Sequence, residues 1–106
     1  MRTKVALAAC PDYSPSNVQA AVETLVADLG GIAAWVRPGQ TVLLKPNLLS
    51  ARTPEQAVTT HPEVVRALIR MVKAAGGCPM VADSGMSVIQ IERVWEKTGF
   101  KAMCGE

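Results

Sequence analysis

The chain has 106 residues, of which 49% are hydrophobic and 19% are charged, and its formal net charge is +2. This composition is typical of a globular domain or a piece of one, and it excludes a disordered chain. The small charge is scattered along the sequence and no stretch reaches the ~20 apolar residues of a membrane span, so we expect neither a nucleic-acid partner nor a membrane.

The three cysteines are Cys10, Cys78 and Cys104. No two of them stand at the spacing of metal ligands, so we predict no metal site and no cofactor within this chain. An odd number of cysteines without a signal peptide favours reduced thiols, and hence a cytoplasmic protein.

The amino-terminal part predicts a strand followed by a helix. Residues 4–10 hold a short continuous apolar run, which is typical of a strand buried on both faces of a parallel sheet. Ser14 followed by Pro15 is a helix start. Apolar residues then recur at three- and four-residue spacing, so we predict a helix over 15–29 that ends at Gly30.

A second strand and helix follow. Residues 41–45 are apolar up to a lysine, and the proline at position 46 stops the strand. The polar stretch 47–59 predicts a loop that is long enough to suggest a functional role. Thr60 and Glu63 stand at capping-box spacing, which predicts the start of a helix over 62–75.

The last third predicts a strand near 79–83, a turn through Asp83-Ser84-Gly85, and a helix near 87–98. Ser87 and Gln90 stand at the spacing of a further capping box. Residues 100–103 suggest the beginning of a fourth strand, close to the last residue of the chain.

Alternating strands and helices predict an α/β fold with three layers and a mainly parallel sheet built from βαβ units. We see one domain over residues 1–106, and a strand beginning at its end suggests an incomplete part of a larger domain. An incomplete sheet leaves an edge and apolar faces uncovered. We therefore expect self-association, or packing against the remainder of a longer chain.

Residues 39–48 (GQTVLLKPNL) resemble the G-x-x-V-x-x-K-P-N segment of the DUF362 family, a family of unknown function. The segments VTTHPEVV (58–65), AAGG (74–77) with VADS (81–84), and VWEKTG (94–99) follow in the order that the family shows. The resemblance covers nearly all of this chain, which corresponds to the amino-terminal half or less of the family domain.

The resemblance implies a bacterial or archaeal protein of a family whose members mostly have no assigned activity. Many members carry a ferredoxin-like segment with 4Fe–4S motifs elsewhere in the chain. The three cysteines of this chain match no such motif. An iron–sulfur cluster is therefore expected only in another part of a full-length protein.

Polar residues follow the predicted strands where parallel sheets place ligands, at the carboxyl ends beside the starts of the helices. We predict that one cleft there binds a small anionic molecule. Its lining would be Lys45, Asn47, Thr59, Thr60, Asp83 and Ser84. The catalytic residues, if any exist, are unknown.

Each of these residues also has a structural interpretation. Lys45 is an anion clamp, or a solvated lysine at the end of a strand. Asn47 holds a ligand or completes a turn. Asp83 contacts a metal, a hydroxyl group or Lys45, or it helps to cap the next helix. The same two alternatives, ligand contact or a structural role, apply to Ser84. His61 is a general base or, more commonly at a helix start, a capping residue.

Cys10 also follows a predicted strand, where it is either a reactive thiol or, more commonly, a buried inert one.

Two functions stay open. In the first, the chain belongs to an enzyme that acts on a small anionic metabolite, within the iron–sulfur redox system that the family resemblance implies. Alternatively, it is a non-catalytic module for ligand binding or for electron transfer.

Overall fold

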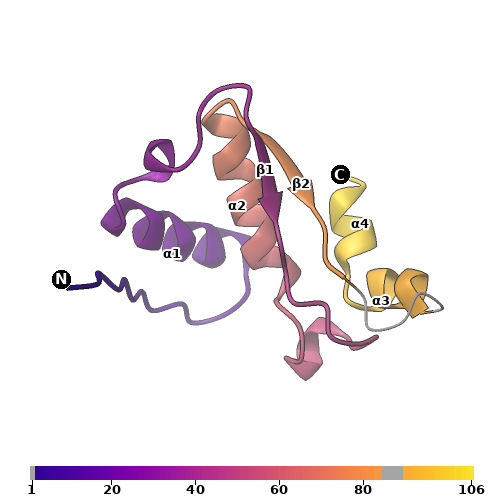
Figure 1. The fold of residues 1–106 in the computed structure, drawn as a ribbon. Helices are drawn as coiled ribbons and strands as arrows, with labels where there is room; N and C mark the ends of the chain where they lie inside the picture. Colours follow the sequence, from indigo (N-terminus) through magenta and orange to yellow (C-terminus); the bar gives the residue numbers. More distant parts are fainter. Residues whose placement is uncertain (1, 85–89) are drawn as a thin grey trace.

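The computed structural model describes residues 2–84 and 90–106 (Figure 1). The elements follow the order α1 (Pro15–Asp28), η1 (Ile32–Ala34), β1 (Thr41–Leu44), η2 (Pro54–Gln56), α2 (Pro62–Ala74), β2 (Cys78–Val81), α3 (Ile91–Lys97) and α4 (Phe100–Cys104). Helices lie before, between and after the two strands of a small parallel sheet. The predicted α/β class with an incomplete parallel sheet is therefore confirmed.

The sheet consists of β1 and β2, which pair in parallel from Thr41 opposite Cys78 to Leu44 opposite Val81. Helix α2 makes the crossover between them, as a βαβ unit requires. The strands predicted at 41–45 and 79–83 are thus present, with small differences at their ends. The ladder continues one step further, because the N–H of Ala82 donates to the carbonyl of Leu44 at 3.2 Å.

The strand predicted at residues 4–10 is wrong. This segment has no regular secondary structure, and in Figure 1 it runs as an extended trace from the amino terminus toward α1. Within the described residues, β1 pairs with β2 alone. Val5 and Leu7 remain 76% and 90% exposed. An apolar run forms a strand only where a neighbouring edge accepts its hydrogen bonds, and this segment has no such neighbour among the described residues.

Helix α1 agrees with the helix predicted over 15–29 and packs on α2 through the buried side chains of Val18, Val22 and Ala67. Ser14 is its N-cap residue, but the Ser14 side chain makes no capping bond. The Oδ1 atom of Asp12 accepts hydrogen bonds from the Ser14 N–H at 2.8 Å and from the Asn17 amide at 2.9 Å. The segment before α1 is therefore attached to the first turn of the helix.

A second cluster covers one face of the sheet. Leu48, Val65, Phe100 and Met103 are buried there, with Leu44 and Val81 among the side chains packed against them. Successive side chains of a strand point to opposite faces of the sheet, so the residues next to Leu44 and Val81 point away from this cluster. Leu43 is 60% exposed and Met80 is 54% exposed, so the other face of the sheet is open.

Helix α2 ends at the predicted glycine pair. Gly76 has a φ of +81°, and the N–H of Gly77 donates to the carbonyl of Val72 at 2.9 Å. Gly77 is also closely surrounded. A Cβ atom at this position would lie 2.7 Å from Val36 Cγ1 and 2.9 Å from Val72 Cγ1. The turn from α2 into β2 therefore depends on a residue without a side chain.

At the carboxyl end, α3 confirms most of the helix predicted over 87–98, whereas Ser87 and Gly85 lie outside the described residues. The fourth strand predicted at 100–103 is wrong, because this segment is helix α4. Gly99, with a φ of +83°, ends one helix and starts the other. Phe100 and Met103 are both buried, and a spacing of three places them on one face of a helix.

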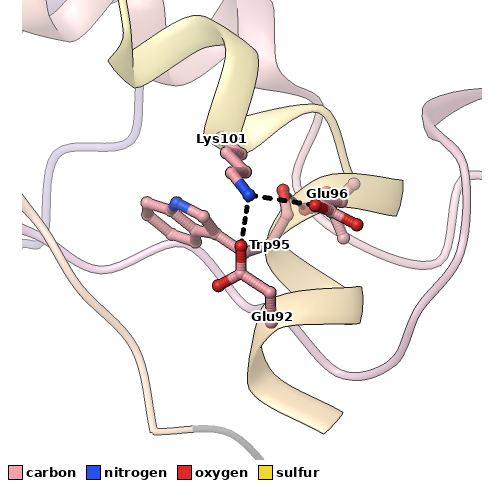
Figure 2. A network of polar contacts seen from close by, with 5 residues as sticks. Glu92, Trp95, Glu96 and Lys101 are labelled. Carbon is pink, nitrogen blue, oxygen red and sulfur yellow. Dashed lines mark hydrogen bonds and ion pairs between the residues drawn. The ribbon is translucent and has the colours of Figure 1, made fainter.

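A polar network joins α3 to α4 (Figure 2). The ammonium group of Lys101 pairs with the carboxylates of Glu92 and, at 2.9 Å, Glu96. Hydrogen bonds to Glu92 and Glu96 raise the pKa of Lys101 to about 12. The three side chains are exposed, so the network orients two short helices and contributes little to stability.

Candidate functional site

Lys45 follows the last residue of β1, and its ammonium group lies 2.9 Å from Oδ1 of Asp83, which follows β2. The same ammonium donates to Oδ1 of Asn47 at 3.2 Å. The Lys45 side chain is 57% exposed and that of Asp83 is 7% exposed. The ion pair therefore buries its negative partner and presents its positive partner to solvent.

Two further hydrogen bonds hold the turn that follows β1. Oδ2 of Asp83 accepts from the N–H of Leu48 at 2.8 Å. Oγ1 of Thr60 accepts from the N–H of Asn47 at 3.3 Å. The turn is thus attached both to Asp83, which follows β2, and to Thr60, two residues before the first residue of α2. This is the edge of the sheet where the sequence predicts the polar residues to meet.

Four of the six predicted residues are joined by direct or shared contacts, and they form what we call the carboxyl-edge cluster: Lys45, Asn47, Thr60 and Asp83. Thr59 is partly buried and Ser84 is exposed. In the part of the chain that the structure describes, neither of these two side chains forms a hydrogen bond with the other four.

The cluster keeps Asp83 ionised. The hydrogen bond from Lys45 lowers the pKa of Asp83 most, and the N–H of Leu48 lowers it further. Partial burial opposes this effect but does not outweigh it. At neutral pH the cluster therefore contains one fixed carboxylate and one ammonium group.

His61 is the N-cap residue of α2. Its Nδ1 atom accepts a hydrogen bond from the N–H of Glu63 at 3.1 Å, so the capping box predicted between Thr60 and Glu63 does not form. Burial lowers the pKa of His61, which favours the neutral ring that can accept this bond. Of the two interpretations of His61, capping is the one that the structure shows.

Two residues beside the cluster take positions that the sequence does not predict. Tyr13 stacks on His61 with ring centroids 3.9 Å apart and an angle of 9° between the rings. Leu48 contributes only its backbone N–H, which no side-chain pattern can reveal.

Cys10 is exposed, and the expectation that it is buried is wrong. Its thiol contacts the carbonyl of Asp12 at 3.1 Å.

A small cavity of about 40 Å³ adjoins Asp83 and is lined also by Leu48, Ile91, Val94 and Trp95. This volume holds a molecule of the size of water. A larger ligand would therefore meet the cluster from the solvent side, where Lys45 is exposed.

Among residues 2–84 and 90–106, no group of three or more His, Cys, Asp or Glu side chains is placed to hold a metal ion. None of the described helices has the length and apolar character needed to cross a membrane.

The comparison with known proteins gives a family. The family model described as "Domain of unknown function (DUF362)" matches residues 42–106. A protein of Synechocystis sp. described as thylakoid-associated is 42% identical over 84 residues, which are 79% of this chain and 26% of the relative. The chain thus matches about a quarter of that relative's length. No solved structure matches the chain. On the family model and this relative, the chain belongs to the DUF362 family.

Proposed function

We propose that this protein binds a small anionic metabolite at the carboxyl-edge cluster, with Lys45 as the main contact. The observation that carries the proposal is the asymmetry of the ion pair, whose ammonium group is exposed while its carboxylate is nearly buried. Asp83 and Asn47 hold the ammonium in one place. A cation fixed in advance loses less conformational entropy when it binds an anion.

The other groups of the cluster support the same chemistry. Oδ1 of Asn47 faces Lys45, and the hydrogen bonds of the described residues leave the Asn47 amide nitrogen without an acceptor. That nitrogen can therefore donate to a ligand. Thr60 leads into α2, whose dipole favours negative charge at this end. Oδ2 of Asp83 is directed at the backbone of Leu48, which reduces its repulsion of an incoming anion.

The test is a titration of the full chain with inorganic phosphate and with succinate, followed by amide chemical shifts. We expect the shifts to centre on Lys45, Asn47 and Thr60. Lys45→Ala should weaken binding by about 1.5–3 kcal/mol, the scale of a charge-assisted hydrogen bond. Lys97→Ala removes the same charge from the end of α3 and should leave binding unchanged. Shifts elsewhere, or equal losses in both variants, would contradict the proposal.

The chemistry that follows binding stays open between an enzyme and a non-catalytic or electron-transfer module. We further propose, from the family resemblance, that an iron–sulfur cluster lies in another segment of a full-length protein. Iron analysis and visible absorbance of such a full-length protein test this. A colourless protein without iron, purified in the absence of oxygen, would contradict it.

Location is also a proposal. The thylakoid association is a property of the Synechocystis relative by its description. For this chain we propose a cytoplasmic location, which its odd number of cysteines favours. Fractionation of cells followed by immunodetection is the test, and recovery in the membrane fraction would contradict the proposal.

A further inference from the structure

A groove of about 310 Å³ is lined by residues of α2 and β2 and by residues of α4 and the end of the chain. Its apolar lining comes from all three elements and includes Ile69, Pro79, Val81 and Met103. The volume is at the lower end of the range of small-molecule sites in proteins. The groove shares no lining residue with the carboxyl-edge cluster.

Cations of α2 border the apolar surface of the groove. Arg66, Arg70 and Lys73 line it, and their spacings of four and three residues place them on one face of the helix. Arg70 and Lys73 are exposed. Two successive turns of α2 therefore present positive charge beside an apolar surface.

The charged groups around the groove leave it positive. The carboxylates of Glu63 and Glu106 both pair with Arg66. Lys101, on α4, is paired with glutamates of α3. Cys104 also lines the groove, and burial raises the pKa of its thiol, so the thiol is neutral at pH 7. The charges of Arg70 and Lys73 are therefore not offset by a further carboxylate among the residues that line the groove.

Arg66 already pairs with a carboxylate at the edge of the groove. Its NH2 atom is 2.5 Å from the Glu106 carboxylate, so a carboxylate of this chain already occupies one side of the guanidinium. Its Nε atom is buried without an acceptor in the described structure. A buried donor without an acceptor is unfavourable, so the carboxylates of this chain do not use the whole hydrogen-bonding capacity of the Arg66 guanidinium.

From the apolar lining and the three cations, we propose that this groove is a second ligand site, for a small anion with an apolar body such as an aryl or alkyl carboxylate. The apolar body contacts Ile69, Val81 and Met103. The carboxylate contacts Arg70 and Lys73, and it competes with Glu106 for Arg66.

The probe is naphthalene carboxylate, titrated into the full chain and followed by amide chemical shifts. We expect shifts at Ile69, Val81 and Met103, and weaker binding of the uncharged naphthalene carboxamide. The double variant Arg70→Gln/Lys73→Gln should bind the carboxylate at least about fivefold more weakly, as expected for two partly exposed charge contacts. The control Lys4→Gln/Arg37→Gln removes the same charge elsewhere and should bind as the wild type does.

A second pair of variants tests the competition with Glu106. Glu106→Gln frees Arg66 from this carboxylate, so binding should tighten by about threefold. Glu23→Gln changes the net charge equally from α1 and should have no effect. Absence of shifts at the groove, equal binding of carboxylate and carboxamide, or equal effects of a variant and its control would each overturn the proposal. Circular dichroism verifies that the variants are folded.

Discussion

Asp83 is the residue on which most of the carboxyl-edge cluster depends. One of its oxygens pairs with Lys45 and the other accepts from the backbone of Leu48. A single carboxylate therefore connects the turn after β1 with the turn after β2. Its side chain is 7% exposed, so loss of these partners would leave a poorly solvated charge.

This arrangement predicts a pH dependence of stability. The pKa of Asp83 is lowered in the folded state by Lys45 and by Leu48. The folded state thus favours the ionised form, and the stabilisation is complete above the unfolded pKa of about 4. It is lost as the pH falls through the lower folded pKa. Asp83→Asn should cost about 1 kcal/mol at neutral pH, because the Asn side chain retains an acceptor but no charge.

Urea unfolding of both proteins between about pH 6 and pH 3 is the measurement. The difference between wild type and Asp83→Asn should shrink toward the acid end of the series. Parallel profiles over the whole range would show that Asp83 gains nothing from its partners. The variant Asp28→Asn, at the end of α1, is a control with the same chemical change.

At this scale the sequence predicts which residues meet but not how they bond. The rule that turns after parallel strands lie at one edge is enough to bring Lys45, Asn47 and Asp83 together. The capping of α2 depends on competition between neighbouring side chains. Thr60 bonds to Asn47 and leaves the cap to His61, and spacing alone cannot decide that outcome.

At the scale of elements, the passage from α2 to β2 depends on Gly77. A methyl group there would overlap with Val36 and Val72, whose side chains are 4% and 1% exposed. Gly77→Ala should therefore destabilise the protein by about 1–3 kcal/mol, as overpacking of a core does. Gly105→Ala is the matched control, since its nearest neighbour would be 3.4 Å away.

Thermal unfolding of both glycine variants measures this effect. A substantial decrease in melting temperature for Gly77→Ala, with little change for Gly105→Ala, is the expected result. Equal stability of the two variants would mean that Val36 and Val72 move away from the added methyl group at little cost. That result would contradict the close packing around Gly77.

The two wrong strands have different physical causes. Residues 4–10 have the composition of a strand, but composition does not supply the hydrogen-bonding neighbour. Residues 100–103 (FKAM) form a short, mostly apolar run, and such a run suits a strand or a helix equally well. The positive φ of Gly99 and the burial of both Phe100 and Met103 decide for the helix. Segments with a clear apolar periodicity, such as α1 and α2, are predicted well.

At the scale of the whole molecule, the open face of the sheet predicts self-association. Leu43 and Met80 are more than half exposed on that face. We propose that a second copy of the chain covers this face in solution. In a longer relative, other parts of the same chain are available for this role, and the Synechocystis protein is about four times as long as the matched segment.

Sedimentation at several concentrations is the measurement, and we expect the mass to rise with concentration. Leu43→Ser/Met80→Ser should weaken association by about a hundredfold or more, since each of the two buried apolar side chains contributes about 1.5–3 kcal/mol. Leu29→Ser, at the end of α1, removes a similar side chain elsewhere. A monomer at every concentration would contradict the expectation.

The stack of Tyr13 on His61 provides a natural spectroscopic reporter. The chain contains one tyrosine and one histidine, so the aromatic signals of both are assigned without labelling of single sites. Rings 3.9 Å apart shift each other's proton resonances strongly through their ring currents. Those two sets of signals therefore report, in each of these variants at neutral pH, whether the segment before α1 is attached to the start of α2.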